Sequence, residues 1–197
     1  LDLGLDPDRP TGVVMFGGQG SRQMLRIARD LDGVQLLLLC GHNQALEQRL
    51  RGLRRGAPHA ALGFTDDVAG ALRLGDFFIG KPGPGCLSEA VHLGLPVITF
   101  RNAWTMPQER WNAQWVREQG VGLVVSSLAQ LPGAVAAMSA RLDEFQAAAR
   151  RIDNRAVFEL PDILADLLVA AAAAHPLRAA PARRSTRTAA RRSRART

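Results

Sequence analysis

Two glycine-rich segments of the chain have the composition of turns that bind phosphate groups. The first reads GGQGS (residues 17–21) and follows the apolar run VVMF; the second reads KPGPGC (residues 81–86) and follows FFIG. Glycine lets the backbone turn sharply and approach a ligand, and free N–H groups at a helix start attract anions. Each segment therefore predicts a binding site for a phosphate-bearing ligand. The alternative is a tight strand-to-helix turn that binds no ligand.

Neither segment matches a standard nucleotide motif. A dinucleotide fingerprint would need a third glycine at position 23, where the residue is Gln23. A P-loop lysine is followed by Ser or Thr, whereas Lys81 is followed by Pro82. Both observations disfavour a dehydrogenase or a P-loop enzyme. Lys81 is the only lysine of the chain; it supplies positive charge near a phosphate or is a solvated loop residue.

Polar residues near two expected helix starts complete the candidate chemistry. Glu89 lies one turn into the helix after the second segment, where it could reach a ligand or stabilise the helix dipole. In MPQERWNAQW, Gln108 and Asn112 are four residues apart and share a helical face beside Glu109. Amides and carboxylates there suit a hydroxyl-rich ligand; a solvated helix start is the alternative. The four scattered histidines and two cysteines form no metal-binding pattern.

The elements that position these residues alternate along the chain. Short apolar runs predict strands, and the mixed segments between them predict helices. Strands are expected at about 13–16, 34–40, 60–62, 77–79, 96–100 and 122–125. Helices are expected at about 21–30, 43–53, 68–74, 86–93, 108–119, 131–150 and 154–173. This order predicts an α/β protein with a Rossmann-like, doubly wound parallel sheet. Ligands of such sheets bind beyond the carboxyl ends of the strands, where both glycine-rich segments fall.

Composition divides the chain into three parts: a linker at 1–11, a folded domain at 12–174 and a tail at 175–197. The tail has eight arginines and no acid, so it accounts for the net charge of +7, and it is expected to be disordered. The tail could contact an anionic membrane surface, whereas no specific nucleic acid is expected because it lacks interleaved aromatic residues. The cysteines indicate free thiols in a reducing compartment. No apolar run is long enough to span a bilayer, and no signal peptide is visible.

Three segments, taken in order, resemble a known family. VVMFGGQGS, GFTDDVAGALRLGDFFIGKPGPGCLSEAVHLGLPVITF and MPQERWNAQWV are similar to the C-terminal, nucleotide-sugar-binding half of glycosyltransferase family 28. The monogalactosyldiacylglycerol synthases and processive diacylglycerol glucosyltransferases are the most similar groups, and the likeness covers about residues 3–125. The resemblance implies the C-terminal half of a GT-B enzyme. Such an enzyme would transfer a hexose, with inversion, from UDP-galactose or UDP-glucose to a diacylglycerol-type lipid. No cofactor or metal is expected.

The resemblance also implies roles for individual residues. Gly18, Gly20 and Ser21 would lie against the diphosphate, and Phe64 and Thr65 would border the uracil. Glu89 would hold the ribose, and Gln108 and Glu109 would contact the donor sugar, with Asn112 beside them. The remaining expected binding residues are Gly83, Pro84, Gly85, Cys86 and Leu87, which would present a helix start to the diphosphate, and Lys81, which would supply positive charge near it.

The half of the family that holds the acceptor and the catalytic base has no counterpart in the sequence. Because the chain begins at Leu1, it is interpreted as a fragment, or as the donor subunit of a split UDP-N-acetylglucosamine transferase, and in either case little transfer is expected from it alone. A non-catalytic nucleotide-sugar-binding module is the third alternative. The expected location is cytoplasmic, peripheral at the inner face of the plasma membrane. UDP-sugar 2-epimerases are disfavoured because their sugar-site histidine and carboxylates are not recognisable.

Overall fold

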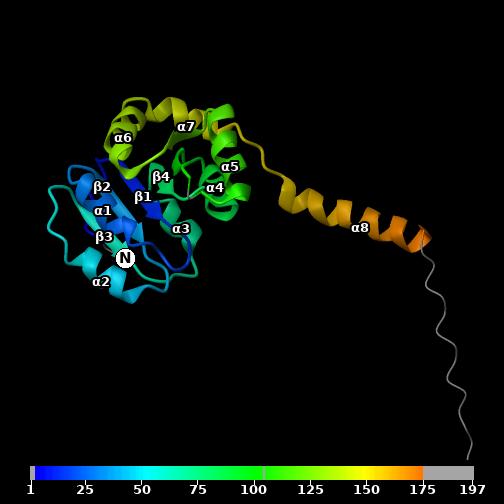
Figure 1. Cartoon of the computed structure of the whole chain (residues 1–197), viewed down its shortest axis with the longest axis horizontal. Coiled ribbons are helices and arrows are strands. Elements are labelled where there is room, and N and C mark those ends of the chain that lie inside the picture. Colours follow the sequence, from blue (N-terminus) through cyan, green and yellow to red (C-terminus); the bar gives the residue numbers. More distant parts are fainter. Residues whose placement is uncertain (1–2, 104, 175–197) are drawn as a thin grey trace, which may run out of the picture. The chain divides into compact units, whose positions relative to one another are not determined.

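The core of the protein is one parallel sheet of six strands. The structure, a computed structural model, describes residues 3–103 and 105–174 (Figure 1). The strands lie in the order β3-β2-β1-β4-β5-β6, and all neighbours are parallel. Their bounds are β1 Thr11–Met15, β2 Gln35–Leu39, β3 His59–Leu62, β4 Phe77–Gly80, β5 Val97–Phe100 and β6 Gly122–Val125. Since the chain order reverses between β1 and β4, the sheet is doubly wound, as predicted.

Helices connect the strands and continue after the last one. They are α1 Gln23–Asp30, α2 Gln44–Arg51, α3 Val68–Leu72, α4 Pro84–His92, α5 Pro107–Glu118, α6 Leu131–Ala140, α7 Leu142–Arg150 and α8 Ala156–Ala174, with a short 3₁₀ helix, η1, at Leu128–Gln130. None of the described helices is long and apolar enough to cross a membrane.

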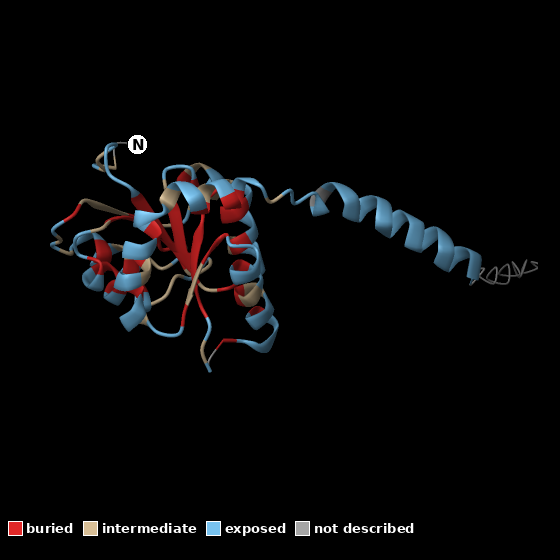
Figure 2. Ribbon diagram, turned by 90° about the horizontal axis from the view of Figure 1, so that it is seen from above, coloured by how far each residue is buried: buried red, intermediate tan, exposed pale blue. Residues whose placement is uncertain are grey.

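Alternate residues of each strand enter two hydrophobic clusters on opposite faces of the sheet. In β2, Leu36 and Leu38 pack in the cluster that contains residues of α1, α2 and α6, whereas Leu37 and Leu39 pack with residues of α3, α4 and α5. Figure 2 shows the buried strands in red between helices whose outer surfaces are pale blue. Burial on both faces explains why these strands are apolar throughout, which is the pattern that predicted the fold.

The helix expected at 131–150 is interrupted in the structure. Arg141, with φ −131° and ψ 29°, is not helical and separates α6 from α7. Buried residues recur at helical spacing through both helices, so the apolar pattern gives no sign of the break. The cause is tertiary. Met138 of α6 and Phe145 of α7 pack in one cluster, whereas Ala148 of α7 packs in the other, so the bend lets α7 contact both clusters.

The structure divides the chain into two units, which differ from the expected domain at 12–174. The first is Leu1–Asn154 and the second Arg155–Thr197. In the expected linker, the backbone N–H of Asp6 donates to Gln35 Oε1 at 2.8 Å, so this segment contacts the sheet. In the second unit, α8 exposes large apolar side chains that include Phe158, Leu164 and Leu168. The expected tail at 175–197 lies outside the described residues.

Candidate functional site

The first glycine-rich segment forms the turn between β1 and α1. Gly17 and Gly20 have φ values of 78° and 60°, and the Gly20 N–H donates to the Gly17 carbonyl at 3.0 Å. The next loop along the sheet supports this turn, because the His42 N–H donates to the carbonyl of Gly18 at 2.8 Å. Gly41 makes this approach possible: its φ is 59°, and a Cβ there would overlap the Gly18 carbonyl. The segment therefore has a fixed backbone at the carboxyl end of β1.

The second glycine-rich segment opens α4. Gly83 is the N-cap residue, Pro84 is at the helix start, and neither a capping side chain nor an acidic residue occupies the first turn. The helix begins at Pro84, two residues before the start at residue 86 that the sequence predicted. Its first N–H groups have no intrahelical acceptor, so they are available to an anion at the carboxyl end of β4.

A cavity of about 210 Å³ lies between these two segments. It brings together five of the predicted site residues: Gly18, Phe64, Thr65, Cys86 and Glu89. The remaining lining residues are Met15, Gly17, Leu39, Gly41, Gly63 and Val68. Backbone and apolar groups form most of this wall, and the Glu89 carboxylate is its acidic group. Such a lining suits a flat ring joined to a hydroxyl-bearing group.

An imidazole ring stacks on the aromatic wall of this cavity. The rings of His42 and Phe64 have centroids 4.1 Å apart and are inclined by 15°. Phe64 is 58% exposed, so the stack holds a ring that otherwise has few contacts. Neither Gly41 nor His42 was among the residues predicted from the sequence. Their position could have indicated them, because both directly follow a buried strand that is the neighbour of the strand before GGQGS.

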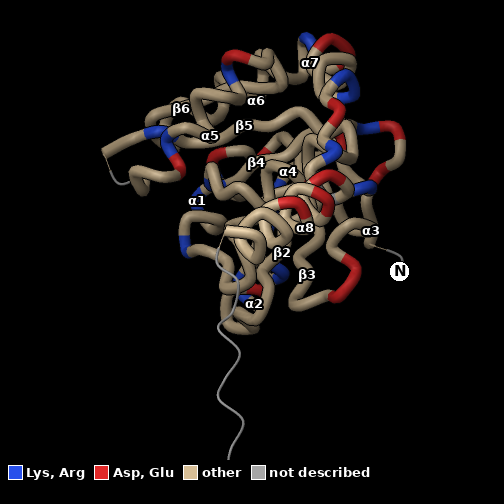
Figure 3. Tube along the Cα trace, turned by 90° about the vertical axis from the view of Figure 1, so that its right-hand side faces the viewer, with Lys and Arg blue, Asp and Glu red and all other residues tan. Residues whose placement is uncertain are grey.

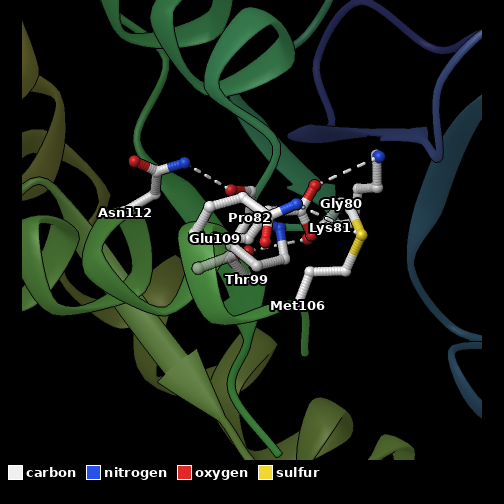
Figure 4. Close-up of polar contacts among 8 residues, drawn as sticks. Gly80, Lys81, Pro82, Thr99, Met106, Glu109 and Asn112 are labelled. Atoms are coloured by element: carbon white, nitrogen blue, oxygen red, sulfur yellow. Dashed lines mark hydrogen bonds and ion pairs between the residues drawn. The ribbon is translucent and has the colours of Figure 1, made fainter. Parts of the chain in front are cut away.

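Lys81, Glu109 and Asn112 fix the second segment to α5 (Figure 4). Lys81 Nζ lies 3.3 Å from Glu109 Oε1, and Glu109 is only 7% exposed. The Asn112 amide donates to the carbonyl of Pro82 at 2.8 Å, and the Thr99 hydroxyl donates to the carbonyl of Gly80 at 2.9 Å. These contacts hold the segment between β4 and α4 in one conformation. Glu109 and Asn112 thus have structural partners at positions where the sequence suggested sugar contacts.

The other predicted residues lie around the cavity or apart from it. Ser21 Oγ accepts the N–H of Gln23 at the start of α1, and Gly20 is in the β1–α1 turn. Gly85 is exposed in the first turn of α4, and the Gln108 amide contacts the sulfur of Met106 at 3.5 Å. A separate cavity of about 560 Å³, between α4 and α5, is lined in part by Pro84, Leu87 and Asn112.

Both cysteines are free thiols with raised pKa values. Burial, with a further contribution from Glu89, raises the pKa of Cys86 above its ordinary value, against an opposing effect of Lys81. Burial raises the pKa of Cys40 to about 11. At neutral pH, Cys86 is therefore a protonated, weakly polar part of the cavity wall. Within residues 3–103 and 105–174, no group of three or more His, Cys, Asp and Glu side chains could hold a metal ion.

Comparison with known proteins shows what the chain is similar to. Residues 13–166 match the family model described as the glycosyltransferase family 28 C-terminal domain. The chloroplastic monogalactosyldiacylglycerol synthase of Spinacia oleracea is 31% identical over 137 residues, which are 64% of this chain and 26% of that protein. The processive diacylglycerol beta-glucosyltransferase of Bacillus pumilus is 32% identical over 133 residues, 62% of this chain and 33% of that protein. The chain thus matches about a third or less of these relatives' length.

Solved structures share the fold at lower identity. Acinetobacter baumannii MurG matches with a TM-score of 0.65 and 18% identity, over 81% of this chain and 50% of that one. Os79 of O. sativa, solved in complex with UDP, matches with a TM-score of 0.59 and 17% identity, over 76% of this chain and 36% of that one. These similarities show that the fold is that of GT-B glycosyltransferases. With the family match over most of its length, the chain belongs to glycosyltransferase family 28, as its C-terminal domain.

Proposed function

We propose that this domain binds the UDP-sugar donor, UDP-galactose or UDP-glucose, of an inverting glycosyltransferase whose acceptor is a diacylglycerol-type lipid. The observation that carries the proposal is the cavity between the β1–α1 turn and the start of α4. It combines an aromatic wall, a carboxylate and a helix start without an acidic residue. Relatives named for galactosyl and glucosyl transfer to diacylglycerol support the choice of donor and acceptor.

In this proposal the nucleotide occupies the cavity with its ring beside Phe64 and Thr65. The Glu89 carboxylate, on the same cavity wall, accepts hydrogen bonds from the ribose hydroxyls. The diphosphate then lies toward Gly18 and the α4 start, where backbone N–H groups and the helix dipole favour negative charge. Gln108 and Glu109, at the start of α5, are the residues proposed to contact the hexose.

The chemistry proposed for the complete enzyme is direct displacement at the anomeric carbon. An acceptor hydroxyl forms the new glycosidic bond, the bond to the UDP oxygen breaks, and a base outside this chain takes the hydroxyl proton. This domain contributes by stabilising the charge that develops on the departing diphosphate. In this proposal the α4 amides and the Lys81 ammonium are the groups that stabilise this charge, and no metal ion is required.

Calorimetric titration of the full chain with UDP tests the proposal. We expect saturable binding that is unchanged by EDTA. Glu89→Ala should weaken UDP about tenfold or more, because it removes charge-assisted hydrogen bonds to the ribose. The same substitution should have a much smaller effect on 2′,3′-dideoxy-UDP, which has no ribose hydroxyls. Ser88→Ala, at an exposed neighbouring position that does not line this cavity, is the matched control. Absence of saturable heat at millimolar UDP would overturn the proposal.

A further inference from the structure

A basic pocket lies at the carboxyl ends of β5 and β6. Its volume is about 450 Å³, and its lining residues are Arg101, Asn102, Ala103, Arg110 and Arg117. Arg101 directly follows β5, and the other two arginines are seven residues apart on α5, about two turns on one side of the helix. Figure 3 shows basic segments beside α5 and β6. Three positive charges therefore line one pocket, and no carboxylate is among its lining residues.

The three arginines have no acidic partner among the described residues. The ion pairs of residues 3–103 and 105–174 involve other cations, namely Arg26, Arg51, Lys81, Arg141 and Arg155. A guanidinium group surrounded by like charges is unfavourable unless water, salt or a ligand screens it. The pocket thus concentrates positive charge that the rest of the described chain does not neutralise.

Backbone carbonyl groups hold two of these guanidinium groups in place. Arg110 Nε donates to the carbonyl of Thr105 at 3.2 Å, and Arg117 Nη2 donates to the carbonyl of Val124 at 3.4 Å. A guanidinium has five N–H donors, so one carbonyl contact orients the group and leaves donors for a ligand. Two of the three charges are therefore positioned before any anion arrives.

Asn102, another lining residue of the pocket, also has defined contacts. The N–H of Asn102 donates to Thr105 Oγ1 at 2.9 Å, and Thr105 is 8% exposed. The Asn102 amide donates to the carbonyl of Ser126 at 3.4 Å, which ties the loop to the segment after β6. Asn102 therefore has defined contacts with a buried hydroxyl and with the segment after β6.

We propose that this pocket binds a phosphate-bearing anion, at a site separate from the proposed donor cavity. Guanidinium groups match the geometry of phosphate oxygens and bind them through paired N–H donors. The donor cavity is lined from the ends of β1 and β2, the segment after β3, the start of α3, and α4, and it shares no residue with this pocket. The phosphate is that of a free ion or of a phospholipid head group, which present the same oxygens to the three arginines.

The first test follows inorganic phosphate binding to the full chain by NMR, through the Arg Nε–Hε signals and the backbone amides of residues 101, 102, 110 and 117. We expect these signals to shift and saturate. Phosphate affinity should fall about tenfold or more in the pocket variant, which combines Arg101→Gln, Arg110→Gln and Arg117→Gln. The control Arg29→Gln, Arg49→Gln, Arg54→Gln removes the same charge from exposed positions outside the pocket and should bind as the original chain does.

Vesicle flotation separates the two sources of phosphate. If vesicles of phosphatidylcholine with phosphatidic acid bind the pocket variant more weakly than the control, the ligand is a lipid head group. If both variants float equally while only the pocket variant loses inorganic phosphate, the ligand is a free ion. The proposal would be overturned if phosphate affinity fell equally in both variants, or if the NMR signals of the pocket residues showed no saturable shift with phosphate. UDP affinity should be the same in the two variants, so this result stands apart from the donor proposal.

Discussion

Lys81 Nζ and Glu109 Oε1 lie 3.3 Å apart and join the loop between β4 and α4 to α5. The other ion pairs of the described residues connect positions three or four apart in the sequence, so this one alone among them links two elements distant in sequence. Glu109 is 7% exposed, whereas the Lys81 side chain is 43% exposed. The lysine therefore compensates a buried carboxylate while its ammonium group remains accessible to a ligand.

Lys81→Met should destabilise the protein and weaken UDP binding. The substitution keeps an unbranched side chain of similar length but leaves the Glu109 carboxylate buried without its cation. Because Lys81 is partly solvated, we expect a loss of about 1 kcal/mol in the free energy of unfolding, rather than the larger loss of a fully buried pair. Urea unfolding measures this loss, and calorimetry measures UDP affinity, which should fall about tenfold.

The double variant Lys81→Met, Glu109→Gln separates the two roles of the lysine. It removes both charges, so most of the stability should return while UDP affinity stays low. If Lys81→Met alone leaves UDP affinity unchanged, the lysine has only a structural role.

Gly41→Ala should disrupt the support of the first glycine-rich turn. A Cβ at this left-handed position would overlap the carbonyl of Gly18, a backbone atom that cannot rotate away. The unfavourable φ alone costs about 1–2 kcal/mol, and the overlap adds to it. We expect the free energy of unfolding to fall by more than about 2 kcal/mol in urea unfolding. Gly33→Ala, whose Cβ would meet no atom within 4 Å, is the control; equal losses in the two variants would contradict the interpretation.

The fold could be predicted from the sequence because every residue of the four central strands, β1, β2, β4 and β5, is buried. Runs such as QLLLL in β2 are buried at every position, so their composition reports their environment directly. The break at Arg141 could not be predicted, since the buried positions keep helical spacing across it. Whether α7 continues α6 depends on how Phe145 packs in one cluster and Ala148 in the other, and these contacts join residues that are distant in sequence.

The candidate site was predictable in part for the same reason. Gly18 and Phe64 follow strand ends, Glu89 lies in the helix after β4, and a parallel sheet brings these strand ends to one edge. Pairwise partners were not predictable. The sequence favoured Asn112 as a ligand contact, but its amide donates to the carbonyl of Pro82, 30 residues away. The His42–Phe64 stack likewise depends on the neighbouring positions of two loops, which no local pattern encodes.

Phe64→Ala should weaken UDP binding without destabilising the fold. The ring lines the donor cavity yet is 58% exposed, so its removal uncovers little of the core. Loss of an aromatic surface beside a base costs about 1–3 kcal/mol of binding, or roughly a tenfold or greater rise in Kd. Calorimetry with UDP measures this rise, and the thermal midpoint should be unchanged. His42→Ala removes the ring behind Phe64 and should have a smaller effect; a larger effect would make His42 the main contact.

Stability should decline above pH 9 because of Cys40. Burial raises the pKa of this thiol in the folded protein from its ordinary value of 9.0 to about 11, so the folded state holds the proton more tightly. The resulting stability is fully present below pH 9 and is lost as the pH rises toward 11. Urea midpoints at pH 8 and pH 10.5 measure this decline. Cys40→Ala should make it shallower, whereas Ser88→Ala, at an exposed site, should leave it unaltered.

UDP should protect Cys86 from alkylation. Cys86 is partly exposed in the donor cavity and Cys40 is fully buried, so N-ethylmaleimide should modify Cys86 first in the folded chain. Because burial raises the pKa of Cys86, its thiolate is scarce at pH 7.5, and the reaction should be slower than with a small free thiol and faster at higher pH. Saturating UDP covers the cavity wall and should slow labelling several-fold, as mass spectrometry would show. Unchanged labelling at a UDP concentration that saturates the calorimetric signal would place the nucleotide elsewhere.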